Sequence, residues 1–320
     1  MDEAEKSIED QKENKDNEAE KNPLLLLLVI LAVLLVVYAV VICMGNRQEE
    51  KEQQEEEAKK IYVTDIETLT GIQFDVGNGE IQLIKEDKTW YDKNDRDFPL
   101  DQSYPKQMEK TFEQLQVERK LENGDSLEAY GLEDPQYTMI LTAQDGRQTV
   151  LYFGNVTGDS YYLTLNEKTE IYTVSTSVVK NLQYSMEDMA QLDTIPSIGS
   201  GNLKKVSISQ GTNTIEYDSE QEDDTKSLAT IAGGLGVLTL TDVADYSVEE
   251  TDLGKYGLDE QNRTTETAIY TSDQKEKTIT LYLGKEDGKG NRYVQLSDSK
   301  IVYRVEIEKC KNMLNQDTGS

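Results

Sequence analysis

The sequence predicts an α+β fold in which two tandem β-rich repeats, each an antiparallel meander with one main helix, follow an N-terminal transmembrane helix. Three observations predict it. The phrase Tyr-Gly-Leu-acidic occurs at residues 130–133 and again at 256–259. Around both copies, short runs alternate apolar and polar residues, which is the pattern of strands with one buried face. A run of 21 residues without a charge, 24–44, precedes both copies.

The repeats are defined by segments that follow each Tyr-Gly-Leu phrase in the same order. The first copy has TVLYFG (149–154), YYLTL (161–165), EIYTV (170–174) and VVKNL (178–182), and the second has TITLYLG (278–284), RYVQL (292–296), KIVYRV (300–305) and KCKNML (309–314). The offset between the copies grows from 126 residues at Tyr-Gly-Leu to 131 at the last strands. This growth falls in turns, as expected for two copies of one folded unit with different loops. We place the repeats at 61–190 and 200–315, each an ordinary domain size.

Three segments precede the repeats. Residues 1–23 are expected to be a disordered acidic tail, because they have too few apolar side chains to offset the entropy of ordering. Residues 24–44 would span about 31 Å as a helix, the thickness of a bilayer core. A cleaved signal peptide and a buried core helix are the alternatives, but a signal peptide has a shorter apolar region and needs small residues at its cleavage point. Residues 45–60 are expected to form a charged helical stalk.

The orientation of the membrane segment follows from its position more than from its flanking charges. Four basic residues lie between residue 1 and the segment, and four lie between the segment and residue 60. Long domains are translocated largely regardless of charge. We therefore expect a single-pass protein of the cell membrane with its N-terminus in the cytoplasm and its C-terminal repeats extracytoplasmic.

Local signals place the elements of the first repeat. Residues 71–87 form two alternating runs joined at Asn78-Gly79, which predicts a hairpin. Trp90 is the expected core anchor of a third short strand. Met108, Phe112 and Leu115 lie on one face of a predicted helix, and four strands (137–143, 148–154, 161–165 and 171–174) and a short capped helix (175–182) follow.

The second repeat is expected to follow the same plan with a weaker helix. Its hairpin covers 202–217, and its main helix covers 225–238. Gly233, Gly234 and Gly236 lower the helical propensity of that segment. The glycine of each Tyr-Gly-Leu phrase is interpreted as a position with positive φ or a close backbone approach, with the preceding tyrosine as a packing residue.

The ordered set of motifs in the first repeat resembles the bacterial family DUF4340. The motifs are Trp-x-Asp (90–92), FPLDQSYPKQMEKTFEQLQ (98–116), YGLEDP (130–135), LYFG (151–154), YYL (161–163) and IYTVS (171–175). Most of 61–185 resembles the family, whereas the second copy lacks the tryptophan and has DEQN (259–262) in place of EDPQ (133–136). The resemblance implies a membrane-anchored chain with tandem copies. Some relatives resemble auxiliary components of ABC-type transport systems, so the resemblance suggests a membrane protein such as an ABC transporter as a partner; the family's biochemical role is undefined.

The composition excludes most catalytic machinery. The sequence has no histidine, which removes Ser-His, Cys-His and His-metal sites, and Cys310 is the only cysteine after the membrane segment. The phrases DTGS (317–320), DKNDRD (92–97) and GGLG (233–236) each lack the context of a protease, calcium or phosphate site. A net charge of −29 argues against nucleic acid as a partner.

We therefore predict no catalytic, cofactor-binding or metal-binding residues. The expected function is a non-enzymatic, membrane-tethered, extracytoplasmic binding or assembly module that contacts the lipid bilayer through residues 24–44. The alternatives are a cryptic carboxylate-dependent hydrolase and a purely structural surface spacer. Paired Asp or Glu side chains buried in a cleft between the repeats would favour the hydrolase.

Overall fold

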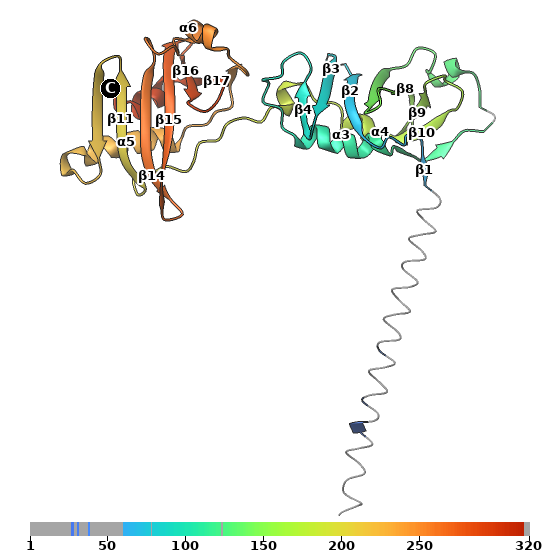
Figure 1. The fold of residues 1–320 in the computed structure, drawn as a ribbon, viewed down its shortest axis with the longest axis horizontal. Helices are drawn as coiled ribbons and strands as arrows, with labels where there is room; N and C mark the ends of the chain where they lie inside the picture. The colour runs from blue at the N-terminus through green and yellow to red at the C-terminus, as the bar shows by residue number, and fades with distance from the viewer. Residues whose placement is uncertain are drawn as a thin grey trace, which may run out of the picture. The chain divides into compact units, whose positions relative to one another are not determined.

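The computed structural model describes residues 27, 28, 31, 38, 60–77, 79–122 and 124–316 (Figure 1). The predicted acidic tail, the stalk up to residue 59 and all but four residues of the predicted membrane segment lie outside them. Leu27, Leu28, Leu31 and Tyr38 are helical and exposed. Among the described residues, no helix combines the length and the apolar character needed to cross a bilayer. Residues from Tyr62 onward form one compact unit, and the domain boundaries stay a prediction.

Within residues 60–316, the first sheet has eight strands, and every neighbouring pair is antiparallel. Their order is β4 (Thr89–Asp92), β3 (Ile81–Glu86), β2 (Leu69–Asp75), β7 (Tyr137–Ala143), β8 (Gln148–Thr157), β9 (Ser160–Leu165), β10 (Tyr172–Ser175) and β6 (Arg119–Lys120). The predicted hairpin, the strand of Trp90 and the four later strands are confirmed. Trp90 is 1% exposed, as expected of a core anchor.

Within residues 60–316, the second sheet has the same strand order as the first but one strand fewer. The order is β12 (Asn213–Asp218), β11 (Leu203–Gln210), β14 (Thr264–Ser272), β15 (Lys275–Glu286), β16 (Asn291–Leu296), β17 (Val302–Glu306) and β13 (Val243–Asp245). No described strand of this sheet corresponds to β4, which agrees with the missing tryptophan. The structure therefore confirms an α+β fold of mostly antiparallel strands.

Between residues 60 and 316, the helices are few and short. They are α3 (Ser103–Glu113), α4 (Thr176–Lys180), α5 (Thr225–Gly236), α6 (Leu253–Tyr256) and α7 (Ile307–Met313), with 3-10 turns η1 (Leu127–Tyr130), η2 (Glu187–Met189), η3 (Glu222–Asp224) and η4 (Glu250–Asp252). Two short strands, β1 (Ile61–Tyr62) and β5 (Gln116–Val117), pair separately. The predicted first-repeat helix is confirmed, except that it ends at Glu113 and Leu115 is buried just beyond it.

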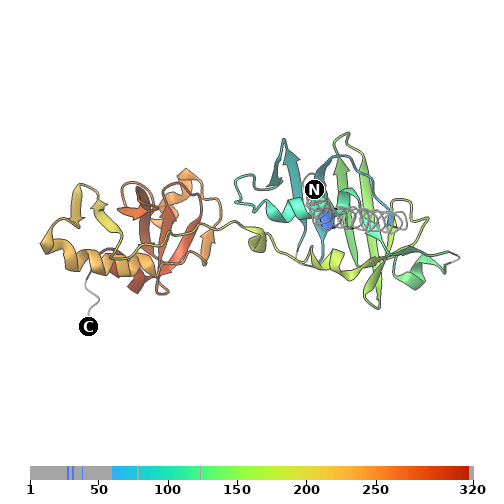
Figure 2. The ribbon, with the colours of Figure 1, turned by 90° about the horizontal axis from the view of Figure 1, so that it is seen from below.

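Each sheet has its own apolar core. Trp90 and Phe112 belong to the first core, and Ile231, Tyr303 and Met313 belong to the second. Figure 2 shows α5 lying along one face of the second sheet. Burial of these apolar faces is the main favourable contribution to folding.

The repeated Tyr-Gly-Leu phrase is a turn that rests directly on a strand. Gly131 and Gly257 have φ of 67° and 66°, in the left-handed region that glycine adopts without strain. Gly154 in β8 and Gly284 in β15 lie beneath this turn, where an added Cβ would stand 2.2 Å from the carbonyl oxygen of the phrase's tyrosine in each repeat. The glycine that closes each Leu-Tyr-x-Gly motif is therefore required for close backbone approach.

The side chains of the phrase complete the contact. Tyr130 packs edge-on against Tyr162 with ring centroids 4.6 Å apart, and Tyr256 packs in the same way against Tyr293 at 5.0 Å. The leucine that follows each glycine is fully buried. The sequence interpretation of a structural role for these residues is confirmed.

We predict that Gly154→Ala and Gly284→Ala each destabilise their own sheet by about 1–3 kcal/mol, the usual cost of overpacking. A chain of residues 60–316 carries one native reporter for each sheet, because Trp90 is the only tryptophan and Cys310 is its only cysteine. Urea unfolding followed by tryptophan fluorescence should detect the first variant, and labelling of the Cys310 thiol should detect the second. Gly199→Ala is the control, because its Cβ would meet nothing within 4 Å. Equal midpoints for all three variants would contradict this account.

The glycines of α5 have opposite environments. A Cβ on Gly234 would stand 2.6 Å from the backbone nitrogen of Met313 in α7, whereas a Cβ on Gly233 would meet nothing within 4 Å. The sequence suggested only that these glycines weaken the helix. The structure shows that Gly234 also lets α7 approach α5 closely.

We expect Gly233→Ala to stabilise the second sheet by about 0.5–1 kcal/mol, since alanine has the higher helical propensity. Gly234→Ala should destabilise it, because the α5–α7 contact must open. Protection of the Cys310 thiol in urea would measure both changes. If both substitutions changed the urea midpoint in the same direction, the proposed difference between these neighbouring positions would be wrong.

Candidate functional site

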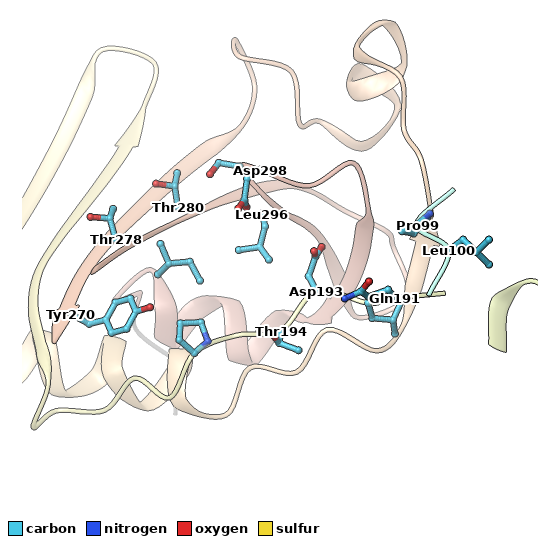
Figure 3. A pocket seen from close by; sticks show the side chains of 14 residues that line it. Pro99, Leu100, Gln191, Asp193, Thr194, Tyr270, Thr278, Thr280, Leu296 and Asp298 are labelled. Carbon is cyan, nitrogen blue, oxygen red and sulfur yellow. The ribbon is translucent and has the colours of Figure 1, made fainter. Parts of the chain in front are cut away.

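An open groove with a volume of about 730 Å³ lies beside the second sheet, on the surface of the compact unit (Figure 3). One side is the chain segment 191–196, and the other is formed by the start of β15 and the end of β16. Figure 3 shows Thr278, Thr280 and Asp298 together on one rim and Thr194 on the opposite side. The residues that line it are Pro99, Leu100, Gln191, Leu192, Asp193, Thr194, Pro196, Tyr270, Thr278, Ile279, Thr280, Leu296, Ser297 and Asp298.

The first sheet has a smaller groove, of about 360 Å³, at the equivalent place. A segment that precedes the sheet, 63–68, forms one side. Ala143 at the end of β7, Thr149 in β8 and Leu165 at the end of β9 correspond to Tyr270, Ile279 and Leu296 of the second groove, as the strand registers show. The groove is thus a feature of the repeat itself.

The two grooves differ in chemistry. The first groove is lined by three carboxylates, Asp65, Glu67 and Asp145, and by one basic residue, Arg147, which forms an ion pair with Asp145. The second groove has two carboxylates, Asp193 and Asp298, and none of its lining residues is basic. Its floor is apolar, because Tyr270, Ile279 and Leu296 face the core side of the sheet and are buried.

Asp193 is held in place by the second sheet. Its Oδ2 accepts hydrogen bonds from Ser299 Oγ at 2.5 Å and from Tyr303 Oη at 3.0 Å, and its backbone N–H donates to Tyr303 Oη at 2.8 Å. Burial raises the pKa of Tyr303, so the phenol remains a donor at physiological pH. This wall of the groove is therefore fixed before any ligand arrives.

The same segment is tied to residues that precede α3. Ala190 forms an isolated β-bridge with Leu100. The Gln191 N–H donates to the Pro99 carbonyl at 2.7 Å, and the Asp101 N–H donates to the Met189 carbonyl at 2.8 Å. Hydrogen bonds thus restrain the segment at Asp193 and at the residues just before it.

The aspartates of the loop DKNDRD have partners of three different kinds. Asp92 Oδ2 accepts the Asp95 N–H at 2.9 Å, Asp95 Oδ2 accepts from Ser247 Oγ at 2.5 Å, and Asp97 pairs with Lys300 at 2.7 Å. No group of three or more potential metal ligands lies together in the described ranges. Asp95, Asp97 and Asp193 each bond to a different partner, so among these residues no carboxylate bonds to another.

The other predicted motifs are placed as follows. GGLG lies inside α5, where its backbone amides are part of a helix. DTGS lies outside the described residues. The absence of catalytic, cofactor and metal residues stays a prediction. The groove was not predicted, because it depends on where the ends of separate strands and a connecting segment meet.

Glu266 in β14 is a buried acidic residue that was not predicted from the sequence. It is fully buried, and neither carboxyl oxygen has a hydrogen-bond partner. Register places it opposite Leu281, as Met139 is opposite Leu151 in the first sheet. The second core therefore has an acid where the first has a methionine. The signal was an acidic residue on the apolar side of TTETAIY (264–270).

Burial raises the pKa of Glu266 to about 8 from its ordinary 4.5. Cys310 in α7 is also in this core, and burial raises the pKa of its thiol to about 12, with the charge of Glu266 adding to the rise. Because the folded-state pKa of Glu266 exceeds the unfolded one, the folded state is favoured by protonation. That stability is fully present below about pH 4.5 and is lost as the pH rises towards 8.

We predict that Glu266→Met removes this loss, which amounts to about 1.4 kcal/mol per pH unit. Urea unfolding of residues 60–316, followed by circular dichroism at pH 5, 6.5 and 8, should show a midpoint that falls with pH in the native sequence and much less in the variant. Trp90 fluorescence reports the first sheet as an internal control. Glu266→Gln should lose the pH dependence while keeping an unpartnered polar group. A native midpoint that does not fall between pH 5 and 8 would contradict the assignment.

Comparison with known proteins gives one family. The family described as Domain of unknown function (DUF4340) matches the chain twice, over residues 90–233 and 219–316. The two matches are consistent with tandem copies and confirm the resemblance. No curated protein and no solved structure matches the chain.

Proposed function

The chain belongs to the DUF4340 family, and from this premise we propose that it is a membrane-tethered, extracytoplasmic binding or assembly module without catalytic activity. The observation that supports this function is the groove that recurs at the same place in both repeats. Equivalent grooves with different linings are what a duplicated binding unit provides when its two copies diverge.

The membrane tether is proposed from the sequence. Residues 24–44 contain no charge and have the length of a bilayer-spanning helix. We place the short N-terminal tail in the cytoplasm and the repeats outside the membrane. The proposed partner is a membrane protein, and an ABC-type transporter is the one that family resemblance suggests.

The lining of the grooves favours binding over the carboxylate-dependent hydrolase. A hydrolase of this kind needs two carboxyl groups on either side of the scissile bond, with one of them kept protonated. In the second groove, Asp193 is engaged by Ser299 and Tyr303, and Asp298 lies on the exposed rim. Among the residues that the structure describes, Glu266 is the acid whose pKa is raised to near neutrality, and it is fully buried and does not line the groove.

Site-specific cross-linking in membranes tests the proposal against the surface-spacer alternative. A photo-reactive residue at Thr194 in the groove should capture a membrane protein from cells that express the full chain. The same residue at Ile215, which is 56% exposed on β12 and outside the groove, is the matched control. Deletion of residues 24–44 should move the chain to the soluble fraction and abolish capture. Equal cross-linking at both positions would favour a spacer without a dedicated binding surface.

A further inference from the structure

The second groove has an open strand edge running into it. β15 pairs with β14 from Lys275 to Leu283. On its other side, β16 pairs with β15 only from Leu281 onward. The stretch 275–280 therefore has a neighbouring strand on one side and none on the other, and its last three residues line the groove.

Every second residue of this stretch directs its backbone N–H and C=O groups to the side without a neighbouring strand. The Thr280 carbonyl accepts the Ser297 N–H at 3.0 Å, so the polar groups of Thr280 face the β16 side. In an antiparallel strand, every second residue directs its N–H and C=O to the same side. Thr278 and Glu276 therefore direct their backbone N–H and C=O groups to the region beyond the end of β16, where no described strand pairs with them.

The first repeat closes the same edge. β7 and β8 form a shorter hairpin, with 7 and 10 residues against 9 and 12 in β14 and β15. The Asn166 side chain accepts the Val150 N–H at 3.0 Å, which caps the edge directly after β9 ends. In the second repeat, Ser297 corresponds to Asn166 and Thr280 corresponds to Val150. The structure shows no hydrogen bond there from the Thr280 N–H to the Ser297 side chain. The open edge is therefore specific to the second repeat.

The surroundings of the edge define what could pair with it. A strand added beside β15 would direct alternate side chains to the two faces of the sheet. One set would meet the apolar floor of Ile279 and Leu296, and the other would meet the rim with Asp298 (Figure 3). The rim is acidic and the groove has no basic lining residue, so a basic side chain fits the second set.

Other segments of this chain and a second copy fit less well. Residues 1–23 have nine acidic and four basic residues, and residues 47–60 have six and four, so both repel the rim. The outer half of the edge consists of the charged residues Lys275, Glu276 and Lys277. Charged residues on an edge strand disfavour pairing between the β15 strands of two copies of the chain.

We propose that the β15 edge at residues 275–280 binds an extended segment of a partner protein in which apolar and basic residues alternate, added as an antiparallel strand. This inference rests on the proposed function and specifies the partner's chemistry. In such strand addition, backbone hydrogen bonds supply affinity and the alternate side chains supply specificity.

Binding of defined peptides to the full chain in detergent tests the proposal. The probe is an acetylated, amidated peptide of alternating lysine and valine, six residues long and labelled with a fluorophore for anisotropy measurements. One control peptide replaces lysine with glutamate. A second control is N-methylated at alternate residues, which removes backbone donors but keeps the charge, so simple electrostatic attraction is separated from strand pairing.

Substitutions at Thr278 supply the matched protein variants. Thr278→Pro removes an N–H that points away from β14, so the sheet's own ladder is kept while the edge is blocked. Thr278→Val keeps the backbone donor. Asp298→Asn removes the rim charge. We expect Thr278→Pro to weaken binding of the lysine–valine peptide by at least about tenfold, Thr278→Val to weaken it far less than Thr278→Pro, and Asp298→Asn to weaken it several-fold.

Three results would overturn the proposal. They are equal binding of the N-methylated peptide, equal binding to Thr278→Pro protein with native circular dichroism, and a dimer in sedimentation that Thr278→Pro dissolves, which would assign the edge to a second copy. If any of these occurs while cross-linking at Thr194 still captures a partner, the binding function stands and only the mode of recognition is wrong. If cross-linking also fails, the proposed function fails with it.

Discussion

The fold of each repeat depends on one close backbone contact. The tyrosine carbonyl of the Tyr-Gly-Leu turn lies against a strand glycine, Gly154 in the first repeat and Gly284 in the second, with no space for a Cβ between them. The turn glycine, with its positive φ, directs the next leucine into the interior. Two glycines that are 23 residues apart in the first copy and 27 in the second are thus parts of one joint. The joint fixes the segment that leads into the meander, and the remaining strands follow from it.

The second repeat keeps this joint and differs around it. It lacks the strand that contains Trp90 in the first repeat, and a longer β14–β15 hairpin extends past its neighbour. Its core has Glu266 where the first has Met139. α7 approaches α5 closely at Gly234. The differences lie at one edge of the sheet, at the end of the central β14–β15 hairpin and in the core, so they affect both the surface and the stability of the second copy.

Most of the strands and both main helices were predictable, because alternation, turn residues and the internal repeat are local signals. The interpretation of Gly131 and Gly257 was also correct, since few other residues adopt their φ. Short strands such as β6 and β13 were missed, because two or three residues have no recognisable pattern and form only against a partner strand. The groove was missed for a related reason, since its walls come from chain segments about a hundred residues apart that only the fold brings together. Glu266 was visible as an acid at an apolar position, but its burial required knowing which face of β14 is inside.

The position of Cys310 also affects how the chain would respond to oxidants. Its thiol is 1% exposed, and its raised pKa leaves almost no thiolate, the form that reacts with peroxides and disulfides. In the folded second sheet the sulfur is therefore chemically inert. Sulfenic acid or glutathione adducts at this residue would mark molecules whose core had already opened, which makes the thiol a record of damage and not a regulatory switch.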